Sequence, residues 1–284
     1  MSEWHCVLRC ANSAGWHLCL AKMERIGSRR NWRILRLLML RKREKREELG
    51  LVVVEGRREC LRALRCGLPL VEAYVDKSLL GSELEGELSA QCPVFLLDDG
   101  VFEKVSVREN GDGAMALAKI PRPELPKSLR PNPLILLCEA MEKPGNVGAL
   151  LRTADAVGCS LVIIADALTD LWNPNAIRAS QGAIFSVPAV SCGGGEALDF
   201  LRANGVAIVG TSPAAEKSHW DSMPAGPVAI AVGNEHGGLS DFWLRNADVL
   251  LRVPMFGRMS DSLNVATAAA ICLYEVARVR ALGR

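Results

Sequence analysis

Five polar residues in the second half of the sequence are of types that can bind and orient a reacting group. They are two amides, a carboxylate, a hydroxyl and a guanidinium: Asn146, Asn264, Glu235, Ser262 and Arg152. Amides and hydroxyls hold polar ligands by hydrogen bonds, and a guanidinium pairs with a phosphate or an oxyanion. The same residue types also cap helices or lie on solvated faces. The surrounding elements must decide between these uses.

The expected elements bring several of these residues to one rim. Two short apolar runs, each ended by a residue that stops a strand, lie at 228–233 and 249–254. A helix is expected over 263–282, with Asp261 and Ser262 as candidate N-caps. In an open α/β sheet, ligands bind at the edge where loops leave the strands. The pattern therefore favours a binding site made by two strand ends and a helix start.

Three segments, in order along the chain, resemble the motifs of the SpoU-type RNA ribose 2′-O-methyltransferases. They are NVGALLRTA at 146–154, GNEHGGL at 233–239, and VPM at 253–255 followed by SLNV at 262–265. The resemblance covers about residues 23–284. It implies a homodimer whose α/β catalytic domain has a mainly parallel sheet and a deep trefoil knot. It also implies S-adenosylmethionine as methyl donor and a ribose 2′-hydroxyl of structured RNA as acceptor.

The resemblance assigns the five polar residues to catalysis, and it assigns a cofactor-binding set to the strand-end loops and the helix start. That set is Gly210, Thr211, Gly233, Asn234, Val253, Pro254, Met255, Ser262, Leu263, Asn264 and Ala266. Strand-end backbone groups are expected to bond the adenine edge, with Leu263 against its face. Ala266 stands where family members often have Ser, so that hydroxyl is lost.

Each assignment has a structural alternative. Asn146, Ser262 and Asn264 are good helix caps, and Glu235 could serve either catalysis or the folding of its loop. Arg152 could be an ordinary surface arginine. Because a guanidinium stays protonated, we expect Arg152 to orient a phosphate and stabilise an alkoxide rather than to act as a base.

A proline-rich stretch divides the chain. Residues 120–133 contain five prolines and are expected to form a stiff linker. Before it, residues 23–119 resemble a smaller, ribosomal-protein-like α/β substrate-binding domain. After it, residues 134–284 alternate strands and helices, which favours a parallel sheet covered on both faces. Strands are expected there at 134–138, 161–165, 184–187, 206–210, 228–232 and 249–253, and helices at 146–157, from Asn173 onward, at 196–204 and at 263–282.

A basic segment lies near the start of the first domain. Residues 22–46 carry a local charge of +9 in a chain whose net charge is +2. One basic helix is expected from Ile34 to about Glu48. A solvated charged face is the alternative, but this charge density favours contact with RNA phosphates. The predicted RNA-binding residues are Arg29, Arg30, Arg33, Arg36, Arg41, Lys42, Arg152 and Arg178.

Composition sets further bounds. The sequence has no uncharged apolar run of the roughly 18 residues that a membrane helix needs. Its ten cysteines form no C-x-x-C pair, which favours reduced thiols in the cytoplasm. Residues 1–22 resemble nothing downstream and are expected to be a loosely packed extension. Their cysteines and histidines miss the spacings of known zinc modules, so no metal is expected.

Several functions stay open at this point. Ribosomal RNA of the 23S type is the favoured substrate, because a basic helix with an N-terminal substrate domain is common among the rRNA-directed members. Transfer RNA is the alternative within the family, and some related two-domain enzymes confer resistance to ribosome-targeting antibiotics. A non-catalytic RNA-binding or ribosome-assembly protein is the competing class. Neither G-x-G-x-x-G after a strand nor a P-loop motif occurs, which disfavours another nucleotide-binding fold.

Overall fold

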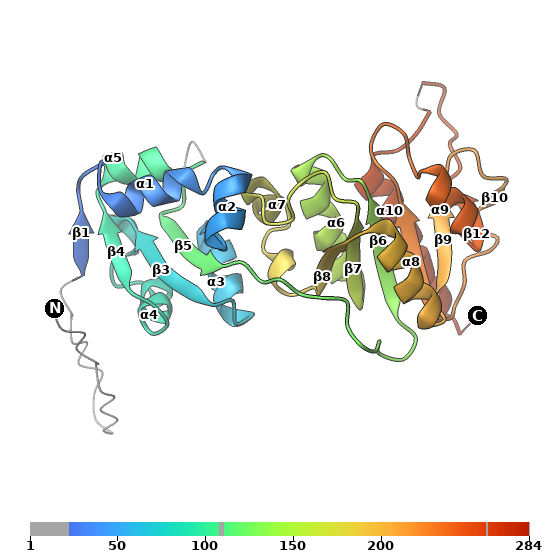
Figure 1. Cartoon of the computed structure of the whole chain (residues 1–284), viewed down its shortest axis with the longest axis horizontal. Coiled ribbons are helices and arrows are strands. Elements are labelled where there is room, and N and C mark those ends of the chain that lie inside the picture. Colours follow the sequence, from blue (N-terminus) through green and yellow to red (C-terminus); the bar gives the residue numbers. More distant parts are fainter. Residues whose placement is uncertain (1–22, 108–110, 260, 284) are drawn as a thin grey trace.

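The computed structural model describes residues 23–107, 111–259 and 261–283, which form two α/β units side by side along the long axis (Figure 1). The N-terminal unit contains five strands: β1 (Glu24–Ile26), β2 (Leu51–Glu55), β3 (Leu70–Val75), β4 (Val94–Leu97) and β5 (Ala114–Lys119). Its helices are α1 (Trp32–Met39), α2 (Arg43–Leu49), α3 (Arg57–Arg65), the 3₁₀ turn η1 (Lys77–Leu79), α4 (Glu83–Ser89) and α5 (Asp99–Val105). The sequence-based prediction of the extension at residues 1–22 lies outside the described residues.

The N-terminal sheet has the order β1-β4-β3-β5-β2. Its strands β1, β4 and β3 run parallel, whereas β5 is antiparallel to both β3 and β2. Helices α1 and α5 cover one face, where Ile34, Leu37 and Phe102 join a buried cluster. Helices α3 and α4 cover the other face. This arrangement leaves the outer side of α1 facing solvent.

The C-terminal unit contains seven strands: β6 (Leu134–Glu139), β7 (Leu161–Ala165), β8 (Ala189–Cys192), β9 (Ala207–Thr211), β10 (Lys217–Ser218), β11 (Val228–Val232) and β12 (Val249–Arg252). Its helices are α6 (Pro144–Val157), α7 (Pro174–Ala179), the 3₁₀ turn η2 (Ala183–Phe185), α8 (Gly194–Ala203), α9 (Asp241–Asn246) and α10 (Val265–Ala281). The strand order is β10-β12-β9-β11-β6-β7-β8, and every pairing is parallel. The expected parallel sheet is therefore confirmed; the trefoil knot stays a prediction.

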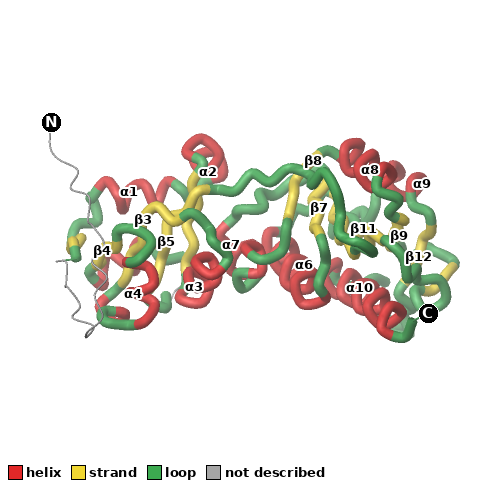
Figure 2. Tube along the Cα trace, turned by 90° about the horizontal axis from the view of Figure 1, so that it is seen from below, coloured by secondary structure: helices red, strands yellow, loops and turns green. Residues whose placement is uncertain are grey.

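Both faces of this sheet are covered, because β7 and β11 are apolar at every position and β6 is apolar up to its last residue, Glu139. Residues of β6 alternate between two buried clusters: Leu136 and Cys138 pack toward α6 and α10, and Ile135 and Leu137 pack toward α8 and α9. Figure 2 shows α6 and α10 along one face and α8 and α9 along the other. Helices α6 and α7 cross closely at Gly148, where a Cβ atom would lie 2.5 Å from the carbonyl oxygen of Ala176.

Three sequence-based predictions of elements are wrong. The strand expected at 184–187 is the turn η2, because Gly182 has φ +89° and starts a turn, and the strand begins after Pro188. Asp261 and Ser262 are not N-caps, since α10 begins later and Asn264 Oδ1 accepts the N–H of Ala266 at 2.9 Å.

The third error concerns the basic helix, which is two helices rather than one. Helix α1 ends at Met39, and α2 begins at Arg43. Arg46 explains the break, because its Nη1 donates to the carbonyl oxygens of Leu40 and Arg41, both at 2.8 Å. A side chain from the second helix therefore stabilises the turn that ends the first.

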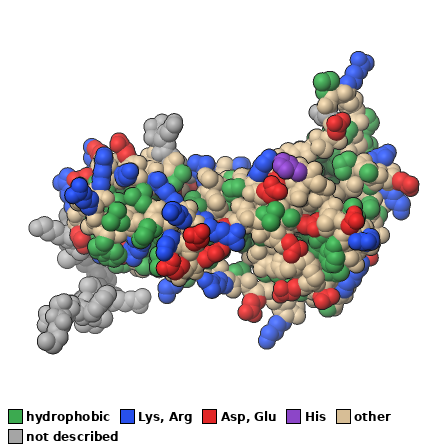
Figure 3. Space-filling model, turned by 45° about the horizontal axis from the view of Figure 1, so that its top comes forward, with side chains coloured by type: hydrophobic (Ala, Val, Ile, Leu, Met, Phe, Trp, Pro, Cys, Tyr) green, Lys and Arg blue, Asp and Glu red, His purple; other side chains and the backbone are tan. Residues whose placement is uncertain are grey.

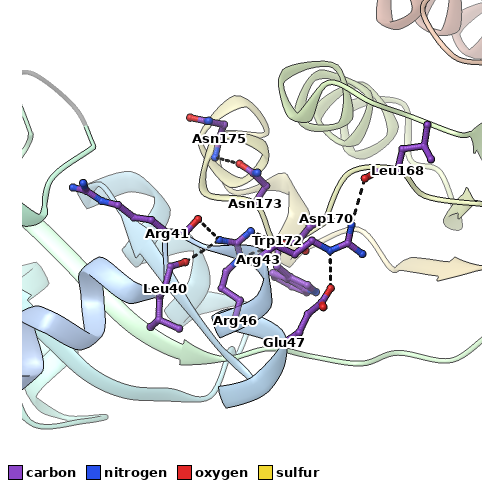
Figure 4. Close-up of polar contacts among 10 residues, drawn as sticks. All are labelled: Leu40, Arg41, Arg43, Arg46, Glu47, Leu168, Asp170, Trp172, Asn173 and Asn175. Carbon is purple, nitrogen blue, oxygen red and sulfur yellow. Dashed lines mark hydrogen bonds and ion pairs between the residues drawn. The ribbon is translucent and has the colours of Figure 1, made fainter.

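The same arginine joins the two units (Figure 4). Its side chain is only 1% exposed, and Nε and Nη2 donate to Asp170 Oδ2 at 2.9 and 2.5 Å. Nearby, Arg43 Nη1 donates to the carbonyl oxygen of Leu168 at 3.3 Å, and Arg62 Nη1 donates to that of Gln181 at 2.6 Å. These contacts tie the segment after β7 to the N-terminal unit.

Candidate active site

The carboxyl ends of β6, β11, β9 and β12 are neighbours in the sheet and lie on the upper side of the molecule in Figure 1. Because all four strands run in the same direction, their loops meet at one rim. The start of α6 follows β6, a tight turn follows β11, and the approach to α10 follows β12. The rim expected from the sequence is therefore present.

Three polar side chains from these loops form a continuous chain of hydrogen bonds. Asn146 Nδ2 donates to Glu235 Oε1 at 2.7 Å, and Asn264 Nδ2 donates to Asn146 Oδ1 at 3.2 Å. The main-chain N–H of Lys143 also donates to Glu235 Oε1, at 3.3 Å. The Asn146 amide is thus held at both ends. Three of the five predicted catalytic residues are brought together.

The side chain of Asn146 is available for these contacts because Asn146 is not the N-cap of α6. The helix begins at Pro144, whose fixed φ and missing N–H suit the first helical position, and Lys143 precedes it. Asn146 therefore lies in the first turn with its side chain turned to the neighbouring loops. The capping alternative for Asn146 is wrong, whereas Asn264 both caps α10 and bonds Asn146.

Glu235 is held as a carboxylate. Burial acts to raise its pKa, but hydrogen bonds from the Asn146 amide and from the main-chain N–H groups of Glu235, Glu142 and Lys143 outweigh burial. The net effect lowers the pKa of Glu235 below its ordinary value. Within the described residues, its second oxygen, Oε2, is buried without a hydrogen-bond partner. The site therefore holds a negative charge next to two amides.

Glu235 is carried by a turn that requires Gly233. A Cβ atom on Gly233 would lie 1.8 Å from the carbonyl carbon of Gly238. Asn234 and Gly238 exchange main-chain hydrogen bonds at 3.1 and 3.2 Å, and Asn234 Oδ1 accepts the N–H of Gly237 at 2.6 Å. Asn234, predicted to bind cofactor, thus uses its side chain to close the turn.

The segment between β12 and α10 offers main-chain groups to a ligand. Within the described residues 253–259 and 261–263, no main-chain N–H or C=O makes a hydrogen bond to another protein group. Val253, Pro254 and Leu263 are partly buried, and Met255 is 36% exposed. Free main-chain groups next to apolar side chains suit a flat heterocycle with a polar edge, and the adenine of S-adenosylmethionine has both features.

Gly210 and Thr211, two of the predicted cofactor-binding residues, lie at the end of β9 and have different structural roles. Thr211 Oγ1 donates to the carbonyl oxygen of Ala231 at 3.0 Å, so this hydroxyl ties β9 to β11. A Cβ atom on Gly210 would lie 2.7 Å from Leu250 Cδ2, so Gly210 is small because side chains pack over it. Ala266 is partly buried in the first turn of α10, close to the asparagine pair.

The remaining predicted site residues stay outside the hydrogen-bonded chain. Arg152 and Ser262 are exposed, and neither makes a hydrogen bond or ion pair with any described residue. Arg178, on the neighbouring helix α7, donates to Asn175 Oδ1 at 2.9 Å. Arg152 therefore projects from α6 as a cation available to an external anion.

One residue of the rim was missed by sequence reasoning. Glu139 ends β6, is only 7% exposed, and its Oε2 accepts the N–H of Ser240 at 2.7 Å. It joins the end of β6 to the loop that follows the glycine turn. A carboxylate that ends a fully apolar strand is the signal that could have identified it.

The predicted RNA-binding residues of the N-terminal unit, five arginines and Lys42, divide into two groups. Arg33 and Arg36 pair with Glu72, Arg29 Nε donates to the carbonyl oxygen of Gly100 at 2.9 Å, and Arg41 Nη2 donates to three carbonyls at the end of α5. Arg30 and Lys42 are exposed, and their side chains contact no partner in the described part of the chain. Figure 3 shows many Lys and Arg side chains over this unit, with hydrophobic side chains between them.

The other features of the described residues concern metal binding, membrane spanning and cysteine reactivity. No group of three or more His, Cys, Asp or Glu residues there could hold a metal ion, and no helix there is long and apolar enough to cross a membrane. The cysteines of this part of the chain are unpaired. Burial raises the pKa of the Cys159 and Cys272 thiols to about 12, so neither is a reactive thiolate at neutral pH.

Comparison with known proteins identifies the family. The sequence model of the SpoU rRNA Methylase family matches residues 133–274, the half of the chain that contains the rim. The chain belongs to the SpoU rRNA methylase family. The resemblance seen in the three motifs is thereby confirmed. A second model, the MRM3-like substrate binding domain, matches residues 31–116 of the N-terminal unit.

Relatives of this SpoU family member align over nearly the whole chain. It is 30% identical over 255 residues to the 23S rRNA (guanosine(2553)-2′-O)-methyltransferase RlmP of Bacillus subtilis, covering 89% of this chain and 99% of the relative. It is 31% identical over 256 residues to the 23S rRNA (uridine(2479)-2′-O)-methyltransferase of Streptomyces viridochromogenes, covering 87% and 89%.

Solved structures of RNA methyltransferases are similar to this chain over most of its length. A crystal structure of an RNA 2′-O ribose methyltransferase is 40% identical with a TM-score of 0.79, covering 91% of this chain and 99% of that chain. The SpoU methyltransferase AviRb of Streptomyces viridochromogenes, in complex with the cofactor AdoMet, is 30% identical with a TM-score of 0.83, covering 90% and 100%. The two-unit architecture is therefore shared as a whole.

Proposed function

We propose that this chain transfers a methyl group from S-adenosylmethionine to a ribose 2′-hydroxyl of 23S-type ribosomal RNA. The observation that carries the proposal is the hydrogen-bonded chain of Asn146, Glu235 and Asn264 beside a main-chain segment free to bind a ligand. Ribosomal RNA is favoured because the full-length relatives named above act on 23S rRNA. We assign substrate binding to residues 23–119, a linker to 120–133, and catalysis to 134–284.

The rim residues have separate duties in this proposal. Main-chain groups of the segment before α10 bind the cofactor, which supplies an activated methyl group when bound. The Glu235 carboxylate and the Asn264 amide fix the Asn146 amide, so that Asn146 presents one orientation to the ligands. Arg152, which stays protonated, binds a phosphate of the RNA and stabilises the negative charge that develops on the ribose oxygen.

Methyl transfer to isolated RNA tests the proposal. Labelled S-adenosylmethionine is incubated with unmodified rRNA or tRNA, and the product is digested to nucleosides and identified by mass. Label on a 2′-O-methylnucleoside from the rRNA alone is the expected result. Label from tRNA alone would contradict the substrate, and cofactor binding without label in either pool would favour the non-catalytic alternative.

Arg152→Ala tests the assigned role of the cation. Loss of one charge-stabilising group should lower the transfer rate by roughly 10²- to 10³-fold. Cofactor affinity should hardly change, because Arg152 is assigned to the RNA side. Arg65→Ala is the control: Arg65 is an exposed arginine on α3, on the face of the N-terminal unit opposite α1. Equal rates in Arg152→Ala and wild type would discard the role.

We also propose that the chain is a homodimer joined through the C-terminal unit. The exposed large apolar side chains of this unit include Trp220 at 57%, Phe256 at 83% and Met259 at 92%. Trp220 and Phe256 stack with ring centroids 6.3 Å apart. An exposed aromatic pair of this kind favours a protein interface. A monomeric mass in light scattering at micromolar concentration would count against the dimer.

A further inference from the structure

An exposed apolar stripe follows the outer side of α1. Trp32, Leu35 and Met39 are 56%, 47% and 45% exposed, whereas Ile34 and Leu37 of the same helix are buried in the core. A helix on the surface of a domain usually presents polar groups outward, so a stripe of this size suggests a binding surface.

Two arginine side chains pack against the ring of Trp32. The guanidinium carbons of Arg33 and Arg36 lie 4.6 and 4.8 Å from the centre of its ring. Both arginines pair with Glu72, and Arg33 also pairs with Glu24 at 3.7 Å, so two carboxylates balance the two guanidinium charges. Arg30 lies just before the helix and Lys42 just after it, and both are exposed cations whose side chains have no partner among the described residues.

The position of α1 fits an RNA that also reaches the rim. Helix α1 and the loops after β6, β11 and β12 lie on the same upper side of the molecule in Figure 1. Arg46 and Asp170 fix the segment after α1 to the C-terminal unit. The distance between α1 and the rim is thereby held by the protein rather than by a flexible linker.

We propose that Trp32 stacks on an unpaired nucleobase of the RNA substrate while Arg30 and Lys42, at the two ends of α1, contact its phosphates. This rests on the proposed function and adds to it a single-stranded element at a distance from the methylated ribose. An indole ring offers a stacking face to any base, and the exposed charges of Arg30 and Lys42 favour a polyanion over an apolar protein surface.

Binding of the full chain to two RNA probes tests the stacking. One probe is a short mixed-sequence RNA strand, and the other is the same strand paired into a duplex. Trp32→Ala should weaken binding to the single strand by roughly 5- to 150-fold, since base–aromatic stacking contributes that much per base. It should weaken binding to the duplex much less, because paired bases are not available. Trp32→Phe should restore most of the affinity, since the ring is kept.

Salt dependence separates stacking from charge. Trp32→Ala should leave the slope of log Kd against log salt unchanged, because it removes no cation. Lys42→Ala removes one cation and should lower that slope by about 0.7 for the single strand and by about 0.9 for the duplex. Leu80→Ala, an apolar change at a residue that is 49% exposed and lies between η1 and α4, away from the stripe, is the matched control and should bind both probes as wild type does.

Three results would overturn the proposal. They are unchanged single-strand affinity in Trp32→Ala, equal losses for both probes, and a loss in Leu80→Ala as large as that in Trp32→Ala. The first would leave the stripe to a protein partner. Methyl transfer by the wild type is measured in parallel. If the wild type methylates rRNA and Trp32→Ala binds normally, the stacking is refuted and the proposed function stands.

Discussion

A methyl group added at Gly233 should disable the rim. The new Cβ atom would lie 1.8, 1.9 and 2.1 Å from main-chain atoms of Gly238 and Leu239, so no side-chain rotation can relieve the clash. Overpacking costs about 1–3 kcal/mol, and loss of the two main-chain hydrogen bonds between Asn234 and Gly238 costs about 1 kcal/mol each. We expect Gly233→Ala to lower the free energy of unfolding by about 3–5 kcal/mol.

Gly237→Ala is the matched control in the same turn. Its Cβ atom would lie 3.5 Å from Asn234 Oδ1, an ordinary contact, and its N–H would keep its hydrogen bond. Urea unfolding gives the stability of both variants, and calorimetric titration with S-adenosylmethionine gives their cofactor affinity. Gly233→Ala should lose both, and Gly237→Ala neither. Equal behaviour of the two variants would refute the steric argument.

Two further changes test the domain junction and the rim carboxylate. Asp170→Ala should lower the free energy of unfolding in urea by about 3–5 kcal/mol, because it leaves the buried Arg46 guanidinium without its counter-ion. The control is Lys77→Ala, which breaks an exposed ion pair with Asp99 and should leave the urea midpoint almost unchanged. Equal effects of the two changes would contradict the role of the junction. Glu235 has a lowered pKa, so the stability it contributes is present above its ordinary value of 4.5 and is lost as the pH falls through the lower folded value. The stability difference between wild type and Glu235→Gln should therefore be constant near neutral pH and shrink in acid; a difference that does not depend on pH would mean that the charge contributes nothing.

The sequence alone determined the elements whose pattern is local. The apolar run at Val228–Val232 gave its strand at the observed bounds, because a strand buried on both faces needs apolar residues throughout. Asn173 and Pro174 marked the start of α7, because an asparagine cap before a proline is favourable in any context. The three motifs then placed Asn146, Glu235 and Asn264 at loops of one rim.

The tertiary structure decided which of those residues are in contact and which charged side chains are buried in ion pairs. Glu235 lies 89 residues from Asn146, and their contact exists only because β6 and β11 are neighbours in the sheet. Gly233 had to be glycine because the chain returns against it, and no local pattern reports that approach. Arg46 looked like the other cations of its segment, yet it is buried against Asp170. Burial and pairing between distant segments are set by the whole fold, and a sequence pattern carries only local preference.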